Sequence, residues 1–400
     1  MTNKIYMENS YLRELEAEVL EKKYTNNKYY IKLNRTIFYP NLSGGQPGDK
    51  GTLNGVEILE AYEDGNDIVH VLNNNITGNK AIISIDWDNR LDLMQQHSGQ
   101  HLLSSVFYKL YNGETVGFNI SKEYVYIDIT IPNLSEEEAE KVDYLANRII
   151  YSNFNIKSYF ASEEEIEKLP LRKLPTVSSN IRIVEIDGID FSPCGGTHLN
   201  NTGEIGIIKI RKWERRKGLI RVEFVCGNRA LHDYTWKNQY IKELGLLLTS
   251  KDKDILENIK KLYSSKDLLE KENRELRENL YRIKGDTILE GMETIGDIKF
   301  IYKELDNMDF KELGFIANYL SLNSSLIQIY GLKNEEKGQL YISRTKDIDI
   351  NLQEIYREVA SKFKIKGGGN SNTVQGGCDL KDLKPIMDLF LENIKKQNKG

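Results

Sequence analysis

The chain has 400 residues, of which 40% are hydrophobic and 29% charged, and its formal net charge is −5. The length exceeds one ordinary core, so we expect two to four domains, and the charge excludes the whole-surface positive field of a histone-like protein. No stretch approaches the roughly 20 apolar residues that cross a bilayer, and three cysteines are too few for a disulfide framework, which favours the reducing cytoplasm.

Residues 1–88 are predicted to form a small β-barrel. Tyr29, Ile31 and Leu33 alternate with polar neighbours, as in a strand with one buried face. A β-branched run at 68–72 indicates another strand, and turn residues separate such runs along the segment.

Residues 89–228 are predicted to be one α+β domain. Apolar residues at helical spacing after residue 89 predict a first helix, and a strand pair follows around 115–131. A second helix is expected from Ser135 to Tyr151, with Ser135 as the N-cap and Glu138 at the capping-box position. The pattern then returns to strands up to residue 226.

Residues 229–285 are predicted to be helical, and no proline occurs between Pro193 and Pro385. A heptad seam runs through this segment, with alternating spacings of four and three and polar interruptions at Lys266 and Asn273. The seam comprises Ile255, Ile259, Leu262, Lys266, Leu269, Asn273, Leu276, Leu280 and Ile283. It fits either an intramolecular helical hairpin or a coiled-coil spacer that forms the arm of a homodimer.

Residues 286–400 alternate strands with helices and are predicted to form a C-terminal α/β domain. The expected strands are the hydrophobic runs at 300–302, 326–330 and 340–342. The glycine-rich stretch from Gly367 to Cys378 is expected to be a loop that can approach a ligand backbone closely.

Two short motifs contain candidate ligands for a metal ion. His97 and His101 stand four apart, so a helix places both imidazoles on one face, one turn apart. Cys194 and His198 are also four apart, across a two-glycine turn. Three nitrogens and one sulfur form a tetrahedral set that suits one Zn²⁺ per chain. Four protein ligands usually indicate a closed structural site, whereas a catalytic site leaves a position for water.

A local basic patch is the candidate RNA contact, although the net charge is negative. Within it we assign Arg211, Lys212, Arg215 and Arg216 to RNA binding, and the alternative is a solvated strand-and-hairpin face. The whole patch comprises Lys209, Arg211, Lys212, Arg215, Arg216, Lys217 and Arg221.

Three motifs resemble, in order and spacing, those of the alanyl-tRNA editing proteins and of the editing domain of alanyl-tRNA synthetase. They are Phe-Tyr-Pro through Gly-Gly-Gln-Pro-Gly-Asp-Lys-Gly at 38–51, Asp-Leu-Met-Gln-Gln-His onward at 92–101, and Cys-Gly-Gly-Thr-His at 194–198. The tail, with glycines at 367–369 and 376–377, resembles the C-terminal domain of alanyl-tRNA synthetase. The resemblance covers nearly the whole chain and indicates the long form of the editing proteins.

The resemblance implies a zinc-dependent hydrolase that acts in trans on tRNA(Ala) charged with serine or glycine, without aminoacylation activity. A synthetase pocket sized for alanine cannot strongly reject either amino acid, so a second hydrolytic site is needed. His97 and His101 would then be catalytic as well as ligands, with Gln46 facing the pocket and Thr115 binding the serine hydroxyl that alanine lacks. Further substrate or RNA contacts are expected from the glycines Gly44, Gly45, Gly368 and Gly369.

The chain departs from the family pattern at Ser43, Asn119 and Asn370, where glycine, histidine and arginine are common, and these departures affect details of substrate and RNA contacts. Two rival functions remain. One is an RNA-binding protein whose zinc is purely structural; the other is an editor of threonine tRNA, which has a similar histidine and cysteine arrangement. A metalloprotease is disfavoured because no glutamate follows the first histidine.

Overall fold

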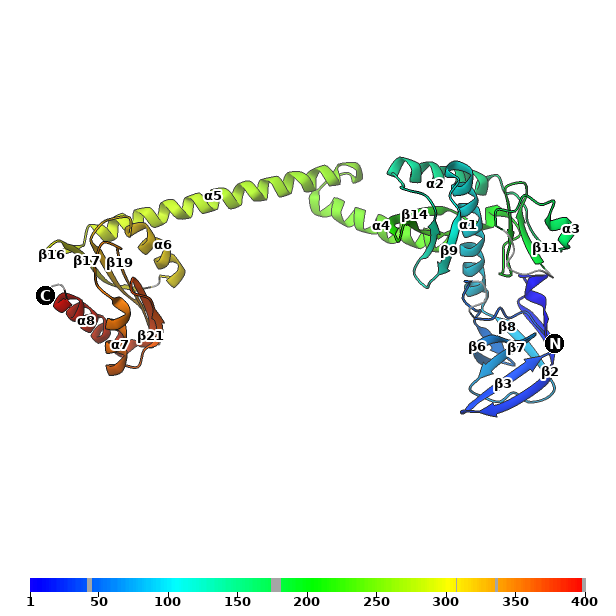
Figure 1. Cartoon of the computed structure of the whole chain (residues 1–400), viewed down its shortest axis with the longest axis horizontal. Helices are drawn as coiled ribbons and strands as arrows, with labels where there is room; N and C mark the ends of the chain where they lie inside the picture. Colours follow the sequence, from blue (N-terminus) through cyan, green and yellow to red (C-terminus); the bar gives the residue numbers. More distant parts are fainter. Residues whose placement is uncertain (42–44, 174–180, 307, 335–336, 398–400) are drawn as a thin grey trace. The chain divides into compact units, whose positions relative to one another are not determined.

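The computed structural model describes residues 1–41, 45–173, 181–306, 308–334 and 337–397. The chain divides into two compact units, residues 1–247 and 248–400, whose elements are labelled in Figure 1. No helix in the described part of the chain combines the length and the apolar character needed to span a bilayer.

Six strands between residues 14 and 85 close into a barrel at the start of the first unit. In order around the barrel they are β2 (Glu14–Thr25), β3 (Lys28–Leu33), β7 (Asp67–Leu72), β6 (Val56–Asp64), β5 (Gly51–Leu53) and β8 (Lys80–Ile85). Asn26 and Asn27 connect β2 to β3 with positive φ angles of 50° and 58°, a turn that matches the strand twist. The segment also contains β1 (Asn3–Lys4), η1 (Ile5–Met7) and β4 (Arg35–Thr36).

A buried ion pair joins the barrel to the helix that follows it, α1 (Trp87–Tyr111). Arg90, in the first turns of α1, is fully buried and binds both carboxylate oxygens of Asp49. The same guanidinium donates to the carbonyl oxygens of Ser10 and Ile37, each at 2.7 Å. Because these bonds satisfy a charge that is costly to bury alone, they fix the start of α1 against the barrel.

The region after the barrel, residues 87–247, is built around the long helix α1. Side chains are buried along most of the length of this helix. A four-stranded antiparallel sheet packs against it, in the order β14 (Ile208–Arg216), β15 (Leu219–Cys226), β10 (Val125–Ile129) and β9 (Thr115–Ile120). A second helix, α2 (Glu136–Tyr151), shares the same core, and its predicted capping box of Ser135 and Glu138 is confirmed.

A three-stranded sheet completes the first unit and leads into the loop at 194–201. Its order is β11 (Ile156–Ala161), β12 (Ile181–Ile186) and β13 (Asp190–Pro193). The remaining elements of this region are α3 (Glu163–Ile166), η2 (Thr202–Ile205) and α4 (Gly227–Leu248). β13 packs beside α1, which brings the loop after β13 close to the middle of that helix.

The second unit is built on a six-stranded mixed sheet. Its order is β16 (Glu293–Ile295), β17 (Ile298–Asp306), β18 (Leu326–Lys333), β19 (Lys337–Arg344), β21 (Thr373–Asp379) and β20 (Lys366–Gly369). One hydrophobic cluster includes side chains of the sheet and of α7 (Leu352–Lys362) and α8 (Leu380–Gln397). Another includes residues of the sheet, α5 (Ile255–Leu289) and α6 (Phe310–Leu320); η3 (Asp252–Asp254) precedes α5.

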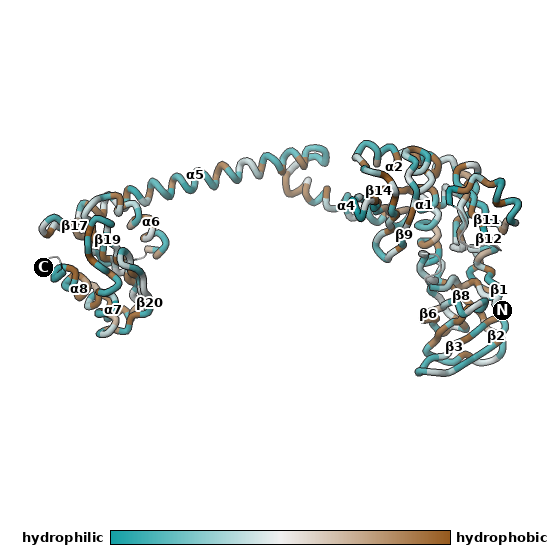
Figure 2. The backbone as a smooth tube through the Cα atoms, viewed as in Figure 1, coloured by the Kyte–Doolittle hydropathy of each residue, from teal (hydrophilic) through white to brown (hydrophobic). Residues whose placement is uncertain are grey.

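Most of α5 is hydrophilic, with short hydrophobic bands along its length (Figure 2). The predicted heptad residues Leu262, Leu269 and Leu276 are 59%, 63% and 61% exposed. The end of the helix packs against α6, where Gly285 lies under Tyr319. The apolar residues of the seam from Leu262 to Ile283 are therefore exposed in the single chain, whereas Ile255 at its start is buried.

The glycine-rich stretch in the second unit is a β-hairpin, so the prediction of a ligand-binding loop was wrong. Gly367 and Gly369 lie in β20, which pairs with β21. A Cβ atom on either residue would lie 2.1 Å from a carbonyl oxygen of β21. These two glycines are needed for close strand approach, whereas a Cβ on Gly368 would meet open space.

Candidate metal centre

Four candidate ligands predicted from the two sequence motifs meet in the first unit. His97 and His101 come from successive turns of α1, and Cys194 and His198 come from the loop after β13. One donor atom from each of the four lies within 4.8 Å of all the others. The Cys194 sulfur lies 3.4 Å from His97 Nε2 and 3.3 Å from His198 Nε2.

The opposite ring nitrogen of each histidine is engaged by a different side chain. His97 Nδ1 lies 2.7 Å from Gln46 Oε1, and His101 Nδ1 lies 3.3 Å from an oxygen of Asp190. His198 Nδ1 lies 3.4 Å from Ser98 Oγ. The Gln46 oxygen and the Asp190 carboxylate can only accept, so both partner histidines carry hydrogen on Nδ1 and direct a lone pair on Nε2 to the centre.

His101 Nε2 provides an independent indication that an ion belongs here. It is a buried polar atom without a hydrogen-bond partner among the residues that the structure describes. A buried nitrogen lone pair that meets three other donor atoms is stabilised by a cation at their common point. Three imidazole nitrogens and one thiol are compatible with Zn²⁺, which takes such ligands in tetrahedral geometry.

Glycine and arginine explain how the ligand loop packs against α1. A Cβ on Gly196 would lie 2.2 Å from Cε1 of His97, so the ring fits only over a glycine. Arg182 on β12 donates from Nη1 to the carbonyl oxygens of Cys194 and Gly196, at 2.9 Å and 2.8 Å. Its Nε also donates to the carbonyl of Met7, at 3.0 Å. The side chain of Arg182 therefore fixes the ligand loop to β12 and to the backbone of Met7.

The electrostatics of the cluster favour the metal-binding forms of Cys194 and His198. Burial raises the pKa of the Cys194 thiol, but the neighbouring His97 and His198 outweigh burial and hold this pKa well below 9.0. Burial, followed by the proximity of His97, lowers the pKa of His198 to about 3. A thiolate and a neutral imidazole are the forms that a metal ion needs. For His101, burial lowers the pKa, but the neighbouring Asp190 and Cys194 outweigh burial and raise this pKa to about 9, so an ion must displace the proton on Nε2.

The cluster opens onto a pocket of about 290 Å³. Its lining consists of His97, Gln100, His101, Thr115, Val116, Gly117, Phe118, Arg172, Lys173, Ser192, Pro193, Cys194 and Gly195. Thr115 lies in this lining, and its hydroxyl donates to Ser104 Oγ at 2.7 Å. The pocket therefore combines metal-binding donors with a hydroxyl on the edge strand β9.

Gln46 does not face the pocket as we expected. Its side chain is 1% exposed and lies behind His97, where Oε1 also accepts from the backbone of Thr197 at 3.1 Å. Its Nε2 donates to Thr197 Oγ1 at 2.8 Å. The amide is therefore occupied by orienting a ligand and its loop. Gly45, at φ 83°, packs on Phe118, and Gly44 lies outside the described residues.

Some of the residues predicted to bind RNA are already engaged by other protein groups, and Arg216 is not. Arg211 pairs with Glu223 at 3.4 Å and Asp233 at 3.5 Å, and Lys212 pairs with Glu223 at 3.4 Å. Arg215 donates to the carbonyl of Pro132, at 2.6 Å. Arg216 is exposed and has no side-chain partner in the described ranges. Gly368 and Gly369 belong to β20 in the second unit.

Sequence reasoning missed the side chains that support the ligands, namely Asp190, Ser98 and Arg182. Ser98 follows His97 directly, but a serine inside a helix carries no signal of its own. Asp190 precedes Cys194 by four residues on a strand, a spacing that no ligand rule uses. Only tertiary packing brings these groups to the histidines.

Comparison with known proteins gives matches in both units. The family described as "Threonyl and Alanyl tRNA synthetase second additional domain" matches residues 181–223, which include Cys194 and His198. The family described as "DHHA1 domain" matches residues 297–396.

Three relatives match most of this chain. Alanyl-tRNA editing protein AlaX-L of Pyrococcus horikoshii is 32% identical over 99% of this chain and 99% of its own. Alanyl-tRNA editing protein Aarsd1 of Rattus norvegicus is 28% identical over 89% of this chain and 86% of its own. The alanine–tRNA ligase of Ignicoccus hospitalis is 28% identical over 95% of this chain, which spans 42% of the ligase. The identity and coverage of the first relative show that the chain belongs to the alanyl-tRNA editing proteins.

Proposed function

We propose that this protein is a zinc-dependent aminoacyl-tRNA deacylase that acts in trans in the cytoplasm. Its substrates would be tRNA(Ala) molecules wrongly charged with serine or glycine. The observation that carries the proposal is the convergence of three imidazole nitrogens and one thiol at the wall of a pocket. Hydrolysis would break the ester between the amino acid and the terminal ribose, and water would supply the hydroxyl and the proton of the two products.

The three histidines and Cys194 would hold the ion. When bound, Zn²⁺ would supply Lewis-acid chemistry toward a water molecule or toward the amino group of the substrate. Gln46 and Asp190 would not touch the ion. Each contacts a ligand histidine and keeps its imidazole in one tautomer and one orientation. We therefore assign Gln46 a positioning role, and we keep His97 and His101 in the reacting site.

Thr115 is the candidate selectivity residue. Because its hydroxyl hydrogen is used by Ser104, the oxygen lone pairs of Thr115 remain to accept from the hydroxyl of a bound serine. Alanine presents no such donor, so its binding gains nothing from this contact. Val116 and Phe118 on the same strand provide apolar walls beside it.

Other parts of the chain support two further proposals. The first is an organisation in four parts, with a barrel over 1–88, a catalytic domain over 89–228, a helical linker over 229–285 and a C-terminal domain over 286–400. The second is a homodimer formed through the α5 seam and the C-terminal domain. It is supported by the exposed leucines at heptad spacing along α5.

A second candidate function is an RNA-binding protein with a structural ion, which the presence of four protein donors favours. The deciding experiment measures deacylation of Ser-, Gly- and Ala-tRNA(Ala) by the purified protein, with and without a zinc chelator. We expect loss of serine or glycine, sparing of alanine, and loss of activity with the chelator. His97→Ala should abolish hydrolysis while circular dichroism shows an intact fold.

Bound zinc and tight tRNA binding without any hydrolysis would establish the structural alternative. A chelated protein that still hydrolyses the ester would show that the ion is not part of the reaction. Faster hydrolysis of mischarged tRNA(Thr) than of mischarged tRNA(Ala) would show that the protein is an editor of threonine tRNA instead.

A further inference from the structure

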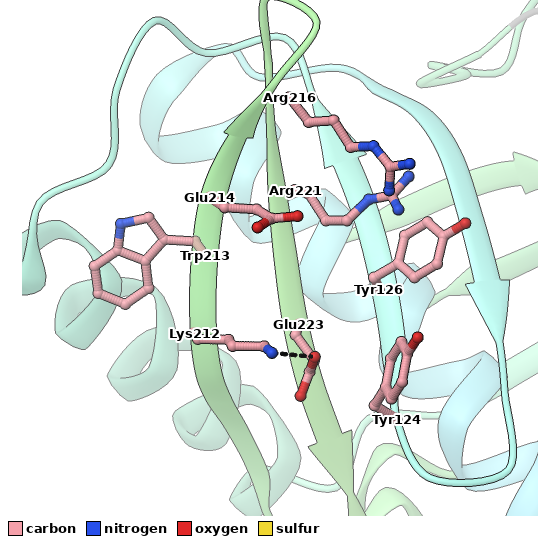
Figure 3. Close-up of a pocket in the computed structure, with 8 residues that line it drawn as sticks. All are labelled: Tyr124, Tyr126, Lys212, Trp213, Glu214, Arg216, Arg221 and Glu223. Carbon is pink, nitrogen blue, oxygen red and sulfur yellow. Dashed lines mark ion pairs between the residues drawn. The ribbon is translucent and has the colours of Figure 1, made fainter. Parts of the chain in front are cut away.

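A second pocket of the first unit lies on the outer face of the sheet β14–β15–β10–β9 (Figure 3). Val125, Ile127 and Ile129 of β10 are buried in the core, so the alternate residues Tyr126 and Asp128 face outward. The pocket holds about 190 Å³. It is lined by Tyr124, Tyr126, Lys212, Trp213, Glu214, Arg216, Arg221 and Glu223.

Some charged side chains of this pocket have an ion-pair partner and others do not. Arg221 is neutralised by Asp128, with two N–O distances of 2.7 Å, and Glu214 stands opposite it on β14. Lys212 is paired with Glu223. Arg216 and its neighbour Lys217, at the hairpin tip, have no acidic partner within the described residues. Glu214 likewise has no ion pair in the described ranges, so the carboxylates of Asp128, Glu214 and Glu223 balance the three cations of the pocket. The exposed cations Arg216 and Lys217 lie together at the hairpin end.

The same pocket contains flat side chains suited to stacking. The Arg221 guanidinium lies 3.6 Å from the ring centroid of Tyr126, and Asp128 holds it there from the side. Tyr124, which is 39% exposed, adds a free aromatic ring just before β10. Figure 3 shows the side chains of Arg216 and Arg221 extending toward Tyr126. Aromatic rings and guanidinium planes are the surfaces on which unpaired nucleobases stack.

The strand pair β10–β9 separates this platform from the candidate metal pocket. Tyr126 pairs with Asn119 on β9, and the preceding residues Gly117 and Phe118 line the metal pocket. Neighbouring strands lie about 4.8 Å apart, so Arg221 on β15 is two strand spacings, roughly 10 Å, from β9. The platform and the candidate metal pocket lie on opposite faces of the sheet, because Phe118, whose ring contacts that of His97, pairs with the buried Ile127. A strand of a few unpaired nucleotides must therefore pass around the edge strand β9 for its acylated end to enter the pocket.

We propose that this face binds the unpaired 3′ nucleotides of the substrate tRNA. Arg216 contacts a backbone phosphate, and a base stacks on Tyr124 and the Arg221 plane. The exposed cations Arg216 and Lys217 at the hairpin end favour a phosphate, and the adjacent flat groups favour nucleobases over other anions. The inference rests on the proposed function because the end of the strand is placed in the metal pocket.

The test uses uncharged tRNA(Ala) transcripts, so that binding is measured independently of hydrolysis. One transcript is complete and the other lacks its four unpaired 3′ nucleotides. Tyr124→Ala is compared with Tyr124→Phe, which keeps the ring. Arg216→Ala is compared with Arg148→Ala, which removes an exposed arginine from α2 on the core side of the sheet. Thermal unfolding verifies that each variant is folded.

For the complete transcript, Tyr124→Ala should weaken binding about tenfold, whereas Tyr124→Phe should bind as the wild type does. Arg216→Ala should weaken binding and reduce the magnitude of the slope of log K against log salt by about 0.7, and Arg148→Ala should change neither. For the shortened transcript, Tyr124→Ala should cause no additional loss, because the stacked base is absent from both complexes.

Full affinity in Tyr124→Ala and Arg216→Ala would overturn the proposal. A tenfold loss that persists with the shortened transcript would also overturn it, since the platform would then hold another part of the RNA. These outcomes are separable from failure of the deacylase assignment. Binding that depends on Tyr124, without hydrolysis of any charged tRNA, supports the platform and rejects the enzyme.

Discussion

Asp190→Asn gives the sharpest test of how the chain supports its metal ligands. The Asp190 carboxylate lies 3.3 Å from His101 Nδ1, and it accepts from Arg172 Nε at 2.8 Å and from Ser192 Oγ at 2.9 Å. An asparagine keeps the shape but has one acceptor oxygen, so its amide hydrogens must face either His101 or Arg172. We expect Zn²⁺ affinity to fall about 10- to 100-fold, which corresponds to roughly 1.4–2.7 kcal/mol.

The assay is a competition titration of Zn²⁺ against a chromophoric chelator, with wild type and variant side by side. Asp187→Asn is the matched control, because Asp187 binds the exposed Lys157 and Asn155 and does not contact a histidine. The control should retain wild-type affinity. Equal Zn²⁺ affinity in Asp190→Asn and wild type would refute the view that this carboxylate orients His101.

Three further changes test other parts of the first unit. Arg90→Met leaves the Asp49 carboxylate buried without its cation, so it should cost about 3–5 kcal/mol and lower the calorimetric midpoint by roughly 10 °C. Lys80→Met, which removes an exposed pair, should leave the midpoint unchanged. Burial lowers the pKa of His70 to about 4 from 6.5, so the unfolded chain takes up a proton first as the pH falls. Urea unfolding should therefore show full stability above pH 6.5 and a loss of about 3 kcal/mol toward pH 4, and His70→Gln should flatten this dependence. Thr115→Val should reduce the preference for Ser-tRNA(Ala) over Ala-tRNA(Ala) in initial deacylation rates, and an unchanged ratio would remove Thr115 from substrate selection.

The candidate ligand set could be predicted because its signal is local. His97 and His101 are one helical turn apart, and the cysteine and histidine of the second motif are held by a short turn, so spacing alone groups each pair. Alternation likewise predicted strands such as β3, and the capping box predicted where α2 begins. These patterns depend on backbone geometry that neighbouring residues determine.

Orientation could not be predicted from the same patterns. Gln46 turns away from the pocket because His97 Nδ1 and the backbone and hydroxyl of Thr197 offer it three hydrogen bonds, and both residues are distant in sequence. The charge of the basic patch also could not be predicted, because it depends on residues that are distant in sequence. Its apparent charge is reduced by carboxylates that other segments supply, such as Asp143 opposite Lys209. A run of cations indicates positive potential only when the acidic neighbours in space are known.

The metal centre draws on segments that lie far apart in the sequence, since Gln46 follows the fourth strand, His97 lies on α1 and His198 follows β13. During synthesis the chain must therefore extend past residue 198 before the centre can assemble. All strands of the barrel lie before residue 86, so the barrel can close earlier, whereas His97 and His101 still lack Cys194 and His198. Metal capture would consequently be a late step in the maturation of the first unit. In the proposed zinc enzyme, a shortage of zinc should therefore impair newly made protein sooner than protein that already holds the ion.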